Sequence, residues 1–146
     1  MLYRTDQDVR EVAERFESCS YALHEFTHAR HITVAVLYLY DFGLEAAMTK
    51  MRESLHRFSA HHGKMGYNET ITRFWLVLVR HYLQASRQQK SLAVLANEAV
   101  ERFADKNLLF RHYTRQRALV DEAKRDWVEP DLLPLASYGI KITIPD

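Results

Sequence analysis

Residues 21–40 set the fold class, and they read YALHEFTHARHITVAVLYLY. At about 100° per residue, the apolar side chains of this stretch point in nearly every direction around a helix. They are Phe26, Ile32, Val34, Val36, Leu37 and Leu39. A helix that is apolar all round belongs at the centre of a protein. We therefore predict a buried helix from about Tyr21 to Tyr40, with Ser20 as its N-cap and Gly43 beyond its end.

Four further helices are predicted around this one. Thr5 and Asp8 form an N-cap signal for an amphipathic helix that ends near Glu17. Apolar residues at helical spacing predict a second surface helix over residues 44–61 and a buried one over 69–85, which follows Asn68 as its cap. A fifth helix is expected over residues 92–104, after Ser91 as its cap.

The C-terminal part of the chain is less regular. A short turn is expected over residues 108–113, a short helix within 114–127, and an irregular tail from Glu129 onward. Residues 140–144 alternate like a strand, but the sequence predicts no second strand to pair with them, so we expect an extended tail. The fold predicted for residues 1–146 is all-α: a single-domain antiparallel helical bundle of about five helices with an irregular C-terminal tail.

The composition restricts the classes of partner. Twenty Lys and Arg balance 19 Asp and Glu in a chain of 146 residues, and a net charge of +1 gives no long-range field to attract nucleic acid or an anionic membrane. No run approaches the ~20 apolar residues of a membrane span, and the first residues lack the apolar run of a signal peptide. Cys19, the single cysteine, cannot form an intrachain disulfide, which fits a reducing compartment. We expect a cytoplasmic protein whose partner is a small molecule or a second copy of the chain in a homodimer.

A cluster of histidines lies on the predicted central helix. His24, His28 and His31 fall within an arc of roughly 60° at helical spacing, and Glu25 flanks them. Burying such a group without a partner costs on the order of several kcal/mol. The cluster must therefore face water, bond to polar partners inside the fold, or hold a ligand.

One interpretation of the cluster is a zinc hydrolase. His24-Glu25-x-x-His28 matches the pattern in which two histidines one helical turn apart hold Zn²⁺ and the glutamate activates a water. A third ligand would have to be Glu53 or Glu69. Enzymes of this class also lay their substrate along a β-sheet edge that this sequence does not predict, so the zinc hydrolase is a minor alternative.

A second interpretation is a di-iron site. Glu25-x-x-His28 has the i, i+3 spacing found inside ferritin-like four-helix bundles, and Glu53-x-x-His56 repeats it. Glu53 and His56, however, lie on a helix face predicted to be solvated. A full site also needs two more glutamates on central helices, and only Glu69 qualifies.

The leading hypothesis uses only side chains on the two helices predicted to be buried. Glu25, His28, His31 and Glu69 would converge at one end of the core as ligands of a divalent metal, Zn or Fe, or as acid and base without a metal. Glu69 and His28 are then the candidate catalytic residues, because neutral imidazole suits both tasks near physiological pH. The structural alternative is a hydrogen-bonded polar cluster in which Glu69 lies at the positive end of its helix dipole.

Other side chains are candidates for contact with a ligand. Tyr38 follows His31 and the small Ala35 along the same helical stripe, which could leave room for a ligand. Tyr67 and Thr72 flank Glu69 and are further ligand-binding candidates. The weaker candidates are His24 and also His62, which stands beside a glycine at a predicted helix end.

Three boxes of sequence carry a resemblance. They are EFTHARHI at 25–32, GYNETITRFW at 66–75 and VEPDL at 128–132. Together they resemble a family of small bacterial all-helical proteins of unknown activity, which has an aromatic-Thr-His-x-x-His box, a Gly-Tyr-His-Glu-Thr-Ile-Thr box and a terminal Pro-Asp-Leu. The resemblance favours His28, His31 and Glu69 over His24. Asn68 departs from the pattern because the family has histidine there, so if that histidine binds a metal in relatives, this chain binds the metal more weakly or not at all.

The sequence thus leads to two functional hypotheses. The first is a small cytoplasmic protein whose buried His and Glu side chains bind a metal ion or a small molecule, with metal-assisted or acid–base chemistry as its possible activity. The rival is a non-catalytic interaction module in which the cluster is structural and an exposed aromatic patch near Trp127 and Tyr138 recruits a partner chain.

Overall fold

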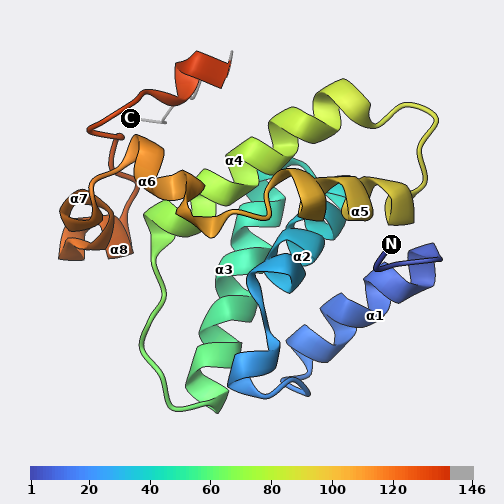
Figure 1. The fold of residues 1–146 in the computed structure, drawn as a ribbon. Helices are drawn as coiled ribbons and strands as arrows, with labels where there is room; N and C mark the ends of the chain where they lie inside the picture. The colour runs from blue at the N-terminus through green and yellow to red at the C-terminus, as the bar shows by residue number, and fades with distance from the viewer. Residues whose placement is uncertain (139–146) are drawn as a thin grey trace.

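The computed structural model describes residues 1–138, and in this range the chain is helical and contains no strand (Figure 1). The five long helices are α1 (Asp6–Glu17), α2 (His28–Asp41), α3 (Leu44–His61), α4 (Glu69–Ser86) and α5 (Leu92–Arg102). The three short helices are α6 (Leu109–His112), α7 (Arg115–Leu119) and α8 (Asp121–Arg125). The 3-10 turns are η1 (Leu23–Glu25), η2 (Lys106–Leu108) and η3 (Leu135–Tyr138). The all-α prediction is confirmed, with more helices than the five expected, and the tail over 140–144 lies outside the described residues.

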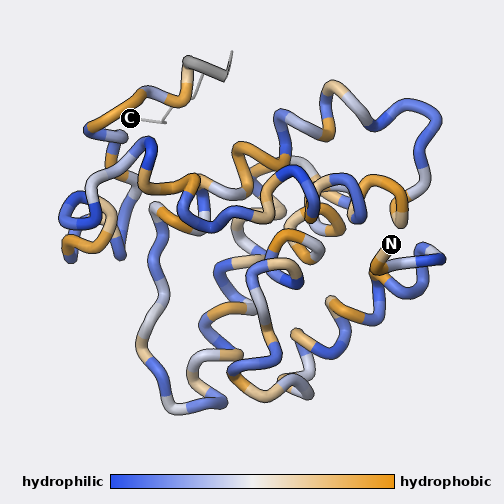
Figure 2. The backbone as a smooth tube through the Cα atoms, viewed as in Figure 1, coloured by the Kyte–Doolittle hydropathy of each residue, from blue (hydrophilic) through white to orange (hydrophobic). Residues whose placement is uncertain are grey.

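Helix α2 lies at the centre of the fold, as its sequence predicts. It packs against α1, α3, α4 and α5, and every side chain from Ile32 to Leu39 is buried. The more amphipathic α1 instead buries one stripe and leaves its other face in water. Figure 2 shows the contrast with the connection between α4 and α5, which is hydrophilic along its length and loops away from the core.

Local capping explains where most long helices begin. Thr5 and Asp8 form a capping box at the start of α1. The Asn68 side chain accepts a 2.9 Å hydrogen bond from the Ile71 amide at the start of α4, and Ser91 accepts one from Val94 at the start of α5. The predicted bounds of α1 and α3 agree with the structure, and those of α4 and α5 agree within two residues.

The predicted start of the central helix at Tyr21 is wrong, because α2 begins at His28. Thr27, rather than Ser20, is its N-cap and accepts a hydrogen bond from the Arg30 amide. The preceding residues form η1, and Phe26 inserts its ring between Phe16 and Phe58, with centroids 4.0 Å and 5.3 Å away. The aromatic contacts bury Phe26 outside a helix, so the seven residues before His28 lie off the axis of α2.

The segment after α8 is fastened to the start of α4. Thr70 is fully buried, and its hydroxyl donates to the Asp126 carbonyl at 2.9 Å and accepts from the Val128 amide at 3.2 Å. Further along, the Leu132 amide donates to the His112 carbonyl at 2.9 Å. These bonds hold the C-terminal part of the described chain against α4 and α6.

Candidate functional site: a pocket lined by two histidines

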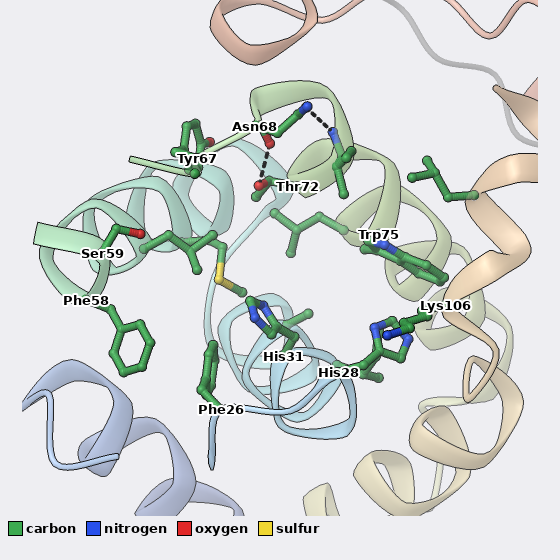
Figure 3. A pocket seen from close by; sticks show the side chains of 18 of the residues that line it. Phe26, His28, His31, Phe58, Ser59, Tyr67, Asn68, Thr72, Trp75 and Lys106 are labelled. Atoms are coloured by element: carbon green, nitrogen blue, oxygen red, sulfur yellow. Dashed lines mark hydrogen bonds between the residues drawn. The ribbon is translucent and has the colours of Figure 1, made fainter. Parts of the chain in front are cut away.

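A pocket of about 750 Å³ lies beside α2. Its walls come from α2, α3 and α4, from the loop between the last two, and from the segment that runs from η2 into α7. Figure 3 shows His28 and His31 next to each other on α2, with Thr72 of α4 on the opposite side of the cavity and Trp75 of α4 close to His28. Both histidines predicted to face inward therefore line one cavity.

His28 is anchored on one side by the chain itself. Its Nε2 lies 2.8 Å from the carbonyl oxygen of Phe103, just after α5, and its ring meets Trp75 edge to face at 4.8 Å between centroids. Because a carbonyl can only accept, the His28 proton sits on Nε2, and Nδ1 is left as the acceptor. Burial lowers the pKa of His28, so the neutral ring is the form present at pH 7.

His31 lies deeper and has no hydrogen-bond partner for its ring nitrogens among residues 1–138. Its ring packs on Phe26 with centroids 4.1 Å apart. Burial, together with the neighbouring His28, lowers its pKa to about 4. No buried side-chain nitrogen or oxygen in the described chain lacks a partner, so the polar atoms of His31 keep access to the pocket. A neutral imidazole with one donor and one acceptor thus faces the cavity unpaired.

Glu69, predicted as a catalytic residue and metal ligand together with the histidines, does not lie with them in the pocket. Arg52 of α3 grips its carboxylate through Nε and Nη2 at 2.9 Å and 2.7 Å, and the Tyr67 hydroxyl donates to Oε1 at 2.6 Å. Burial alone would raise the pKa of Glu69, but the hydrogen bonds from Arg52 and Tyr67 outweigh burial and lower it. Its oxygens are engaged in this ion pair, and Glu69 is not among the residues that line the pocket.

Tyr67 and Thr72 both line the pocket, as their candidate role requires. The Thr72 hydroxyl donates to the Asn68 carbonyl at 2.8 Å. Burial and the bond to Glu69 raise the pKa of Tyr67, so it remains a phenol at neutral pH. Asn68 lines the pocket too, while its amide nitrogen donates to the Ala118 carbonyl at 2.8 Å. In this chain Asn68 therefore serves as a helix cap and as a tie to α7.

Tyr38, predicted as a ligand contact, lies in a different polar cluster from the two histidines. Its hydroxyl donates to Glu17 of α1 at 2.6 Å and lies 3.2 Å from the Ser54 hydroxyl of α3. It is fully buried and does not line the pocket. Tyr38 lies on the same face of α2 as His31 but seven positions further along, a rise of about 10.5 Å, and there its hydroxyl reaches Glu17 and Ser54.

Three more predicted residues lie away from the pocket. Glu25 caps η1 by accepting a 2.7 Å hydrogen bond from the Ala22 amide, and His24 is exposed on the same turn. His62 ends α3 and donates to the Tyr21 carbonyl at 3.1 Å. Each imidazole or carboxylate thus serves the local backbone or faces solvent, and none lines the cavity.

The predicted metal ligands are not brought together. Within residues 1–138, no group of three or more His, Cys, Asp or Glu side chains is arranged to hold a metal ion. Both motif interpretations also required His24 or Glu25 to share a helix with His28, and η1 removes them from α2. Glu53 and His56 are exposed on α3. The zinc hydrolase and di-iron geometries are therefore absent from this part of the chain.

Several lining residues were not expected from the sequence. Aromatic side chains cover much of the wall, with Phe26, Phe58, Trp75 and Phe110 among them. Three cations, Lys64, Lys106 and Arg115, stand at the exposed edge. The aromatic residues read as ordinary core at helical spacing. The cations lie in separate loops and turns, so only the folded chain brings them to one place.

The aromatic patch of the rival hypothesis is only partly described. Trp127 is half-buried, meets Tyr113 edge to face at 6.2 Å and donates through its ring nitrogen to Glu129 at 3.2 Å. The side chain of Tyr138 lies outside the described residues. Trp127 thus packs on its own chain.

No protein-family model, curated protein or solved structure matches this chain in the three comparisons made. Among residues 1–138, no helix combines the length and the apolar character that a membrane crossing requires. The chemistry of the pocket is therefore the basis for a functional proposal.

Proposed function

We propose that the protein binds a small molecule in the pocket between α2, α3 and α4, and that His31 makes a direct hydrogen bond to it. The observation that carries the proposal is an imidazole with unpaired nitrogens facing an aromatic-walled cavity. The ring nitrogens of His31 open into the pocket, so a molecule bound there can reach them. A ligand would supply the partner that residues 1–138 do not.

The size and walls of the pocket fit a drug-sized molecule. Cavities that bind such ligands enclose ~300–1,000 Å³ and combine mostly apolar walls with a few placed polar groups. Here about 750 Å³ is enclosed by rings such as Phe26, Phe58 and Trp75, and by aliphatic side chains such as Ile32 and Met51. The polar groups in the lining include the two imidazoles, the hydroxyls of Ser59, Tyr67 and Thr72, and the cations at the exposed edge.

The two histidines have different tasks in this proposal. His28 is fixed as the Nε2–H tautomer by Phe103 and steadies the wall by contact with Trp75. No partner within the described part of the chain fixes the tautomer of His31, so it can donate to a carbonyl or anionic oxygen of the ligand, or accept from a hydroxyl. Because its pKa is near 4, it does so as a neutral ring at physiological pH.

A fluorescent probe tests this proposal. We would titrate the protein with 1-anilinonaphthalene-8-sulfonate, follow energy transfer from tryptophan, and fit the stoichiometry. Ser59 lines the pocket and its hydroxyl has no hydrogen-bond partner among the described residues, so Ser59→Phe should place a phenyl ring inside the cavity and obstruct dye binding. Ala60→Phe is the matched control, since Ala60 is the exposed next residue of α3.

The expected result is one dye per chain, lost in Ser59→Phe and kept in Ala60→Phe. Circular dichroism checks that both variants keep their helices. Equal binding to all three proteins, or no binding to any, would overturn the proposal, because the dye would then not depend on this cavity.

A further inference from the structure

We infer that the ligand of this pocket is an amphipathic organic anion, with its charged group at the edge near Lys64, Lys106 and Arg115 and its apolar body among the aromatic rings. The inference rests on the proposed function and adds the chemical class of the ligand. It is carried by the charges around the cavity, which are of one sign.

The charged residues that line the pocket are all cationic. Lys64 comes from the loop after α3, Lys106 from η2 and Arg115 from the first position of α7, and no Asp or Glu is among the lining residues. The whole chain, by contrast, carries nearly equal numbers of acidic and basic residues. Three separate segments therefore contribute positive charge to the lining of one pocket, and the Asp105 carboxylate, which acts on His28, is a nearby negative charge outside that lining.

These cations are also free of carboxylate partners. The ion pairs within residues 1–138 involve Arg10, Lys50, Arg52, Arg73, Lys90 and Lys124. None of the three pocket cations takes part in one. Asp105 precedes Lys106, but its carboxylate accepts from the Asn107 amide and caps η2. The Arg115 guanidinium lies over the ring of Phe110, 4.6 Å from its centroid, which leaves its N–H groups at the edge available.

The lining residues differ in solvent exposure between the outer edge of the pocket and its floor. Lys64, Lys106 and Arg115 are exposed, whereas Ile32, Ala35 and Leu76 are buried. Figure 3 shows Lys106 beside His28, with His31 further into the cavity. A ligand that matches this gradient has a negative group outside and an apolar body inside, with a polar atom within reach of His31. Charge-assisted hydrogen bonds from Lys and Arg suit a carboxylate or a phosphate equally.

Two dyes with a common body test the charge. 1-Anilinonaphthalene-8-sulfonate and N-phenyl-1-naphthylamine share their rings, but only the first is an anion. In the variant Lys64→Gln/Lys106→Gln/Arg115→Gln, we expect the Kd of the sulfonate to rise on the order of tenfold and that of the neutral amine to stay the same. Raising the salt concentration should weaken only the sulfonate.

The matched control removes the same amount of charge elsewhere. Arg80, Lys124 and Arg125 are exposed and do not line the pocket, so Arg80→Gln/Lys124→Gln/Arg125→Gln should bind both dyes like the wild type. If the two triple variants behave alike, or if the sulfonate is as insensitive as the amine, the charge inference is overturned. If Ser59→Phe instead binds the dye like the wild type, the proposed binding site itself is overturned, so the failure of the charge inference and the failure of the proposed function are distinguishable.

Competition identifies the charged group. 1-Naphthoate, 1-naphthyl phosphate and the neutral 1-naphthalenemethanol would displace the bound dye in the wild type. We expect both anions to act at lower concentrations than the alcohol, with that advantage lost in the pocket triple variant. The anion that displaces the dye at the lower concentration indicates whether the pocket prefers a carboxylate or a phosphate. If the alcohol displaces the dye as effectively as both anions, the inference is contradicted.

Discussion

The guanidinium of Arg52 holds the carboxylate of Glu69 by two hydrogen bonds, from Nε to Oε1 at 2.9 Å and from Nη2 to Oε2 at 2.7 Å. The pair joins the middle of α3 to the first residue of α4. Its carboxylate is mostly buried, with 13% of the side chain exposed, while the arginine side chain is 38% exposed. A bidentate geometry fixes the relative position of the two helices next to the pocket.

A double-mutant cycle of Arg52→Gln and Glu69→Gln should give a coupling energy of about 1 kcal/mol, since solvent screens the exposed arginine. Urea unfolding of the four proteins measures this coupling energy.

If Glu69 is structural, as its contacts indicate, Glu69→Gln should change the dye Kd by no more than about twofold, because its carboxylate lies outside the pocket. A large loss of dye binding with unchanged stability would contradict that assignment.

The depressed pKa of His31 should make stability depend on pH. In the unfolded chain His31 takes up a proton near pH 6.5, whereas in the folded protein its pKa is about 4. The unfolded state therefore binds more protons between these values, and the free energy of unfolding should fall as pH is lowered through this window. We expect a loss on the order of 1 kcal/mol between pH 6.5 and 5.5.

His31→Phe should flatten this pH dependence, since it removes the titrating group and keeps a ring against Phe26. Urea unfolding at pH 7.0, 6.5, 6.0 and 5.5 measures the slope for both proteins. His28→Phe is measured in the same way, because burial lowers the pKa of His28 as well and this residue also contributes to the pH dependence of stability. An unchanged slope in His31→Phe would mean that its ring is hydrated and charged like a surface histidine.

Thr70→Val should loosen the segment after α8. Its hydroxyl is both donor to Asp126 and acceptor for the Val128 amide, and valine keeps the shape without either bond. Leaving the buried Val128 amide unpaired should cost about 1–3 kcal/mol, whereas the more exposed Asp126 carbonyl can bond to water. Hydrogen exchange should speed up at residue 128, measured against Thr72→Val, which removes a hydroxyl that donates to the Asn68 carbonyl and does not contact the segment after α8. Equal exchange in the two variants would contradict a fastening role for Thr70.

Tyr38→Phe tests the polar cluster on the other side of α2. The hydroxyl that it removes bonds to Glu17 and lies near Ser54, so the variant should lose about 1–2 kcal/mol of stability. Dye binding should stay at the wild-type level because Tyr38 does not line the pocket. Thermal unfolding and the dye titration measure the two effects separately. A weakened dye affinity would restore Tyr38 as a candidate ligand contact.

The sequence predicted the helices well where capping and periodicity act locally. Residues 44–61 form α3 as expected, and the N-caps Thr5, Asn68 and Ser91 stand at their predicted places. The start of α2 was missed because two cap signals, Ser20 and Thr27, compete within one stretch. The choice between them depends on Phe26 packing against Phe16 and Phe58, which are distant in sequence.

The candidate site was predictable only along a single helix. One helical stripe carries His28 and His31, and both line the cavity. Which side chains meet them depends on how other elements pack, and spacing within one helix contains no such information. Glu69 pairs with Arg52 instead, while Lys64 comes from a loop and Lys106 and Arg115 come from the starts of η2 and α7, which are too short to show a periodic signal.

The walls of the cavity run from Leu23 to Arg115 along the chain. A growing chain on the ribosome therefore cannot complete the cavity until η2, α6 and α7 have emerged and docked. A ligand can therefore occupy the cavity only in the fully folded protein. At a hundred times its Kd, such a ligand would stabilise the folded state by ~2.7 kcal/mol. A metabolite that fits this cavity would thus lengthen the lifetime of the protein in the cell whenever it is abundant.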